Sequence, residues 1–177
     1  MRESYRDEDI EFEDEMRIGT RTALGRKWTP IGIRPIGRQQ IGMNICICMF
    51  RSSLLRARCL RFFCRVWTRE CFSIFINERS LRLKRRTLLV ADGATAHRLE
   101  ENDLVELVKL PPYSPELNPV ERFFEELRRK LEFRVFETLE QAEDFVGAAI
   151  QEFLQDKERV KSLTLFPYIK HARSILN

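Results

Sequence analysis

The sequence predicts an α/β fold, in which strands and amphipathic helices follow one another along a single chain. Three stretches indicate it. Residues 9–15 alternate as a strand does, residues 87–91 form the continuous apolar run of a buried strand, and residues 119–131 carry one apolar stripe at helical spacing. The chain has 177 residues, of which 44% are hydrophobic and 33% charged, so it is long enough to bury a core.

The first predicted strand reads D-I-E-F-E-D-E, with Ile10, Phe12 and Asp14 on one face and three glutamates on the other. Asp14 would end the apolar row near the carboxyl end of the strand, where α/β proteins place their chemistry. An acidic turn after a short strand is the alternative. Residues 17–42 hold five glycines and two prolines, which favour short strands and turns of a meander, and residues 41–50 are predicted as another strand.

The stretch at about 45–69 has a different composition. From Arg51 to Arg69 it contains six arginines, no lysine and no acid, without a clear period of 2 or 3.6. We therefore expect a disrupted segment here, with two accounts open: a basic ribbon that binds nucleic acid, or sequence translated out of frame. All five cysteines fall between Cys46 and Cys71, without a C-x-x-C pair, and we interpret them as free thiols.

After a predicted helix from Glu70 to about Leu83, the apolar run 87–91 ends at Asp92-Gly93. A carboxylate at the tip of a buried strand suits a metal ligand, and a turn or helix-capping aspartate is the alternative. His97 would pack nearby or support such a site. A further strand is predicted from Leu104 to Leu110.

The stretch Lys109–Leu131 combines a proline-rich turn with a helix. Asn118 is a good N-cap, and Pro119 suits the first helical position. Glu121 follows at the third position, either as a capping carboxylate or as a catalytic one. The apolar stripe of this helix comprises Val120, Phe123, Phe124, Leu127 and Leu131. A capping box, Thr138 to Gln141, starts a second amphipathic helix, and a weaker helical or irregular tail follows.

The charge is distributed unevenly. Residues 1–15 carry a net charge of −6, residues 16–91 of +15 and residues 92–177 of −5, which together give +4. A block that basic suggests a polyanion as partner, most commonly nucleic acid. No apolar run is long enough to span a bilayer and the acidic start is unlike a signal peptide, so we expect a cytoplasmic protein without membrane contact.

Asp14, Asp92 and Glu121 stand out by position as a set of hard oxygen ligands. Such a set can hold two Mg²⁺ ions for phosphodiester chemistry. The text D-G-A-T-A-H at 92–97, followed by L-P-P-Y-S-P-E-L-N-P-V-E at 110–121, resembles the DDE-superfamily transposases of the mariner and IS-six-thirty insertion-sequence type. The resemblance extends more loosely to F-E-D-E at 12–15 and R-K-W-T-P-I-G at 26–32.

This resemblance implies an RNase H-like catalytic domain at residues 1–155, a mixed sheet flanked by helices, with a C-terminal helical tail at 156–177. Asp14, Asp92 and Glu121 would be the catalytic triad and the ligands of two Mg²⁺ or Mn²⁺ ions. Water would cut DNA at the transposon end, and the freed 3′-OH would then attack target DNA. The family also implies a homodimer on paired ends and, in a bacterium, association with the nucleoid.

The chain departs from the family pattern in three ways. It starts at the first catalytic strand, where relatives carry helix-turn-helix modules first, so we expect an N-terminally truncated form. The 28 residues between Asp92 and Glu121 are fewer than usual. Residues 45–69 replace alternating strands, for which a compensated pair of frameshifts is our hypothesis. The functions left open are an active DNA nuclease and strand transferase, another nuclease of the same fold, such as a junction resolvase, and an inactive remnant that at most binds DNA.

Overall fold

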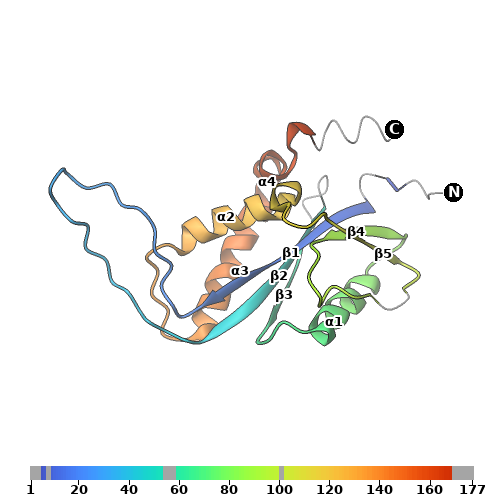
Figure 1. Ribbon diagram of the computed structural model, residues 1–177, viewed down its shortest axis with the longest axis horizontal. Coiled ribbons are helices and arrows are strands. Elements are labelled where there is room, and N and C mark those ends of the chain that lie inside the picture. The colour runs from blue at the N-terminus through green and yellow to red at the C-terminus, as the bar shows by residue number, and fades with distance from the viewer. Residues whose placement is uncertain (1–4, 7–8, 54–58, 100–101, 169–177) are drawn as a thin grey trace.

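A mixed five-stranded sheet forms the centre of the computed structural model, which describes residues 5–6, 9–53, 59–99 and 102–168 (Figure 1). The strands are β1 (Ile10–Gly19), β2 (Ile45–Ser53), β3 (Cys59–Cys64), β4 (Thr87–Ala91) and β5 (Val105–Lys109). Their order in the sheet is β3-β2-β1-β4-β5. The first three strands are antiparallel neighbours, whereas β4 and β5 run parallel to β1. The predicted mixed sheet is therefore confirmed.

Strand β1 is longer than the sequence predicts. It continues beyond Asp14 to Gly19 and pairs with β2 over its whole length. Its parallel pairing with β4 is much shorter, from Ile10 opposite Leu88 to Phe12 opposite Val90. The prediction that Asp14 lies near the carboxyl end of the strand is therefore wrong. Asp14 lies instead where β1 parts from β4, and there the side chain of Asn118, in place of a strand, donates to the backbone oxygen of Glu13.

Strand β2 corrects the expectation that residues 45–69 disrupt the fold. Cys46, Cys48 and Phe50 are buried in the core on one face of the sheet, and Ile47 and Met49 are buried in the core on the other. A central strand covered on both faces has no polar side to alternate with, so its sequence lacks the expected pattern. The prediction is wrong for the described residues, and residues 54–58 lie outside them.

Arg51, which contributed to the unusual composition of this segment, also has a place in the fold. Its guanidinium forms an ion pair with Glu11 on the same face of the sheet. Arg79 of helix α1 (Arg69–Ser80) donates two hydrogen bonds to the same carboxylate, at 2.6 and 3.0 Å. Two arginines thus balance one buried glutamate, which connects β1, β2 and α1.

Helices cover both faces of the sheet. Helix α2 (Pro119–Leu131) and helix α3 (Leu139–Gln155) pack against one face, and α1 packs against the other (Figure 1). The ring of Phe123 on α2 stacks on Phe50 of β2, with centroids 4.3 Å apart. The apolar stripe predicted for α2 is buried from Val120 to Leu127 and partly buried at its end, which confirms that prediction.

Residues 20–44 form a long excursion away from the sheet, not the predicted meander (Figure 1). Within them the structure contains no strand, apart from an isolated bridge between Ala23 and Glu132. Trp28 and Ile31 are fully exposed. The apolar residues of this excursion have no opposing layer to pack against, so strand pairing gains too little burial to offset the backbone entropy.

The C-terminal part begins with helix α4 (Lys157–Thr164), which packs against α2 and α3. Asp156 caps this helix by accepting a hydrogen bond from the N–H of Arg159, at 2.9 Å. Of the predicted tail 156–177, residues 169–177 lie outside the described part of the chain. None of the helices in the described residues combines the length and the apolar composition that crossing a bilayer requires.

Candidate active site

Asp14, Asp92 and Glu121 line one cavity of about 390 Å³. Asp14 lies two residues beyond the last β1 position paired with β4, and Asp92 lies two residues beyond its partner on β4. Because β1 and β4 run parallel, both carboxylates lie equally far beyond the last pair of residues that joins the two strands. Glu121 reaches the cavity from the start of α2. The three predicted residues thus come from three separate segments and meet at one hollow.

The start of α2 is held in place by Asn118. Its side-chain oxygen accepts a hydrogen bond from the N–H of Val120 at 3.1 Å, and its side-chain nitrogen donates to the backbone oxygen of Glu13 at 2.9 Å. The backbone N–H of Asn118 donates to Pro115, so Glu121 does not form the reciprocal cap. Of the two alternatives for Glu121, the geometry agrees with a side chain aimed at the cavity.

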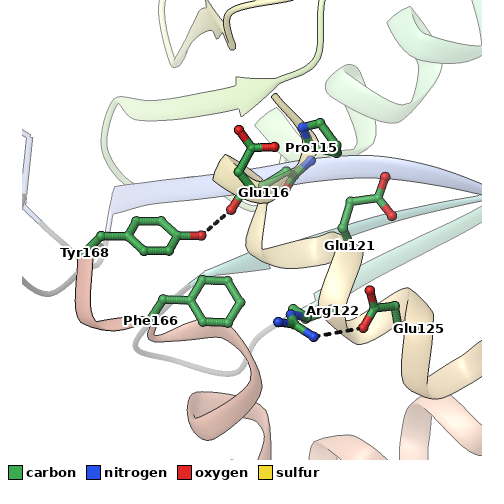
Figure 2. A pocket seen from close by; sticks show the side chains of 8 residues that line it. Pro115, Glu116, Glu121, Arg122, Glu125, Phe166 and Tyr168 are labelled. Atoms are coloured by element: carbon green, nitrogen blue, oxygen red, sulfur yellow. Dashed lines mark hydrogen bonds and ion pairs between the residues drawn. The ribbon is translucent and has the colours of Figure 1, made fainter. Parts of the chain in front are cut away.

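Glu121 also borders a second cavity, of about 520 Å³, on the C-terminal side (Figure 2). Figure 2 shows Arg122 paired with Glu125 there, at 3.1 Å, to the right of Phe166 and Tyr168. The carboxylate of Glu121 itself lies 3.5 Å from Arg128, about two turns further along α2. This ion pair is half exposed, so it leaves the Glu121 carboxylate accessible to another cation.

The electrostatics of Asp14 indicate an unbalanced negative site. Burial, and then the nearby Glu121 carboxylate, raise the pKa of Asp14 from 3.8 to about 8, although the backbone N–H of Glu15 donates to its Oδ1 at 2.9 Å. Ionising the buried Asp14 beside Glu121 is therefore costly unless a cation is present. The donor set consists of carboxylate oxygens, which suits a hard divalent cation such as Mg²⁺ or Mn²⁺.

Asp92 combines the two roles that the sequence left open. Its Oδ1 accepts a hydrogen bond from the N–H of Ala94 at 2.8 Å. A hydrogen bond from a backbone N–H to the side chain of an aspartate two residues earlier is typical of a turn. The same oxygen lies 2.7 Å from Nδ1 of His97. The side chain is nevertheless 54% exposed, toward the cavity. The turn therefore orients the carboxylate without removing it from the site.

Glu13, Glu15 and His97 form a cluster on the opposite face of β1, which sequence reasoning did not predict as a group. Their ligand atoms all lie within 4.8 Å of one another. Burial alone would lower the pKa of His97, but its hydrogen bonds with both glutamates outweigh burial and raise the pKa to about 11. Burial raises the pKa of Glu13 to about 8, against the His97 hydrogen bond. The cluster is thus a buried ion pair between His97 and one glutamate, with the carboxyl of the other glutamate beside it.

The comparisons with known proteins agree with this geometry. The family described as DDE superfamily endonuclease matches residues 9–143. Among curated proteins, none matches the chain in sequence.

Solved structures of similar fold include a pre-cleavage Mos1 transpososome, with a TM-score of 0.60 and 15% identity over 88% of this chain and 56% of that one. Another is a mariner Mos1 paired-end complex with Mg, with a TM-score of 0.62 and 15% identity over 87% and 52%. The catalytic domain of Mos1 mariner transposase has a TM-score of 0.50 and 12% identity over 88% and 82%.

At these identities the likeness establishes the fold, and the predicted RNase H-like architecture is confirmed. The chain spans about half the length of the Mos1 chains in the two complexes. The family match covers well over half of the present chain, from the start of β1 into α3. The chain therefore belongs to the DDE superfamily endonucleases.

Proposed function

We propose that this chain is the catalytic domain of a transposase, which cleaves DNA at the ends of an insertion sequence and transfers the cut strand to target DNA. The observation that carries the proposal is the cavity shared by Asp14, Asp92 and Glu121 in a DDE endonuclease. Support comes from the similar solved structures, which include a Mos1 transposase paired-end complex with the left transposon end and mariner Mos1 paired-end complexes with Mn and with Mg.

Asp14, Asp92 and Glu121 would hold two divalent ions, Mg²⁺ or Mn²⁺. When bound, such ions neutralise the attacked phosphate and activate the attacking oxygen. The chain itself supplies position and charge. Asn118 aims Glu121, the buried Asp14 carboxyl would give up its proton to admit a cation, and the half-exposed ion pair with Arg128 would leave Glu121 available to it.

DNA is the partner that the charge pattern favours. Residues 20–44 carry five basic side chains, all exposed, and no acid.

We further propose a homodimer acting on paired transposon ends, a catalytic domain at 1–155 with a tail at 156–177, and a cytoplasmic location, at the nucleoid if the host is a bacterium. The alternative of an inactive remnant loses its main support, because β2 and β3 complete the sheet where disruption was expected.

The test is metal-dependent nicking of supercoiled DNA by the purified chain, with Mn²⁺, Mg²⁺ or EDTA. Asp92→Asn and Glu121→Gln each remove one proposed ligand, and we expect nicking to fall at least ~100-fold for either. Glu125→Gln is the matched control, since it removes a carboxylate one turn further along the same helix and should leave nicking unchanged.

Two outcomes would contradict the proposal. Nicking that survives Asp92→Asn would point to another centre or to a contaminating nuclease. Absence of nicking, with DNA binding that weakens steeply with salt, would support the remnant instead. Cutting of branched DNA without strand transfer would favour a junction resolvase of the same fold.

A further inference from the structure

His97 bridges the two segments that carry Asp14 and Asp92. It is 1% exposed and lies on the α1 face of the sheet. Its Nδ1 lies 2.7 Å from Oδ1 of Asp92, and its Nε2 lies 2.6 Å from Oε1 of Glu15, the residue that follows Asp14 on β1. One imidazole ring therefore contacts β1 on one side and the turn after β4 on the other.

The sheet itself does not tie these segments together at this level. The backbone pairing of β1 with β4 ends at Phe12 and Val90, two residues before the carboxylates in question. Beyond that point the His97 side chain takes over the connection. The rings of Phe72 and Trp67 pack against it, with centroids 4.8 and 5.5 Å away, so the imidazole has little freedom to turn.

The contacts to Asp92 also select between its two oxygens. The N–H of Ala94 donates to Oδ1 at 2.8 Å, and His97 Nδ1 lies 2.7 Å from the same atom while it hydrogen-bonds the backbone oxygen of Asp92 at 3.2 Å. A carboxylate that is 54% exposed would otherwise turn about its side-chain bonds. These contacts hold one oxygen of a carboxylate that lines the cavity together with Asp14 and Glu121.

We propose that His97 is a positioning residue, which orients the Asp92 carboxylate for a divalent ion and sets its spacing from Asp14 through Glu15. This inference rests on the proposed function, because it assumes that Asp92 is a ligand. Partners of this kind, one step removed from a metal ion, typically change metal affinity by about 10–100-fold when they are removed.

Two substitutions separate positioning from packing. In His97→Asn the amide nitrogen takes the place of Nδ1 and can still donate to Asp92, whereas in His97→Gln it takes the place of Nε2 and can donate only to Glu13 and Glu15 of β1. Both remove the ring and its contacts with Phe72 and Trp67. Both variants therefore lose the ring contacts and the charge, and they differ in whether the contact with Asp92 is kept.

The measurement is Mn²⁺ affinity of the whole chain by calorimetry, with unfolding midpoints recorded alongside. We expect His97→Asn to bind Mn²⁺ at least ~10-fold more tightly than His97→Gln. The Mn²⁺ affinity of His97→Gln should be about 10–100-fold lower than that of the unsubstituted chain. Equal affinities for the two folded variants would overturn the inference.

A second readout needs no substitution, in case neither variant folds. The Nδ1 proton resonance of His97 in the ¹⁵N-labelled chain should shift as Mg²⁺ is added, with the same midpoint as the heat of binding. A resonance that stays in place at saturating Mg²⁺ would overturn the inference. If the unsubstituted chain binds neither ion, the proposed function fails as well. If it binds Mn²⁺ and Asp92→Asn abolishes that binding, while the His97 variants are alike, the positioning role alone fails.

Discussion

Asp14→Asn should make the metal-free protein more stable at neutral pH, although it removes a proposed metal ligand. The carboxyl of Asp14 is 9% exposed, and burial followed by Glu121 raises its pKa from 3.8 to about 8. In the unfolded chain the group returns to its ordinary pKa. Between the two values the folded state binds more protons, so the free energy of unfolding falls as the pH rises from about 4 to about 8.

The size of the effect follows from that shift. At pH 7 roughly three pKa units apply, at about 1.4 kcal/mol each, so an ionisable Asp14 costs on the order of 4 kcal/mol. Asparagine has the same shape and can still accept the N–H of Glu15, but it buries an amide group at a cost of about 1–3 kcal/mol. The net gain expected at pH 7 is therefore about 1–3 kcal/mol, and at pH 5 it should vanish.

The assay is urea unfolding followed by circular dichroism, in EDTA, at pH 5, 7 and 8. Asp144→Asn, on the exposed face of α3, is the control and should change stability by less than ~0.5 kcal/mol at each pH. Adding Mn²⁺ should make the unsubstituted protein more stable than Asp14→Asn, because the asparagine variant gains less stability from the ion. An Asp14→Asn protein that is less stable at pH 7 by the same amount as at pH 5 would refute the reasoning.

Three other substitutions or measurements test the fold around the site. Phe123→Ala removes the ring stacked on Phe50 and should lower the free energy of unfolding by about 3–5 kcal/mol, so a loss below ~1 kcal/mol would contradict the packing. Asn118→Ala removes the cap of α2 and a buried hydrogen bond to β1. It should cost about 1–3 kcal/mol by urea unfolding and weaken Mn²⁺ binding through Glu121, whereas unchanged binding would separate the cap from the site. Burial raises the pKa of Cys46 to about 12, so this thiol should react with a disulfide reagent at pH 8 only as fast as the protein unfolds, and immediate labelling would contradict its burial.

Much of the local structure could be predicted from the sequence. The helix at 119–131 follows from the spacing of its apolar residues and from Asn118-Pro119, and the strand at 87–91 follows from its unbroken apolar run. These patterns depend on residues within a few positions of one another, and their physical causes, capping and one-sided burial, are local. Asp92 and Glu121 could be named because each stands near the end of such an element, whereas Asp14 was named from a strand end that β1 does not have. Their catalytic role remains a prediction.

The tertiary structure decided what depends on residues far apart in the sequence. It extended β1 past Asp14 by pairing it with β2, and it gave the arginine- and cysteine-rich segment a place at the centre of the sheet. It also joined His97 to Glu15 across 82 positions, and its burial of Asp14, followed by the Glu121 charge, raises the pKa of that carboxyl. Burial and electrostatic coupling depend on three-dimensional neighbours, which no local pattern records. The motif residues could therefore be identified from the sequence. The contacts that position them, and that shift the pKa of Asp14, could be identified only from the tertiary structure.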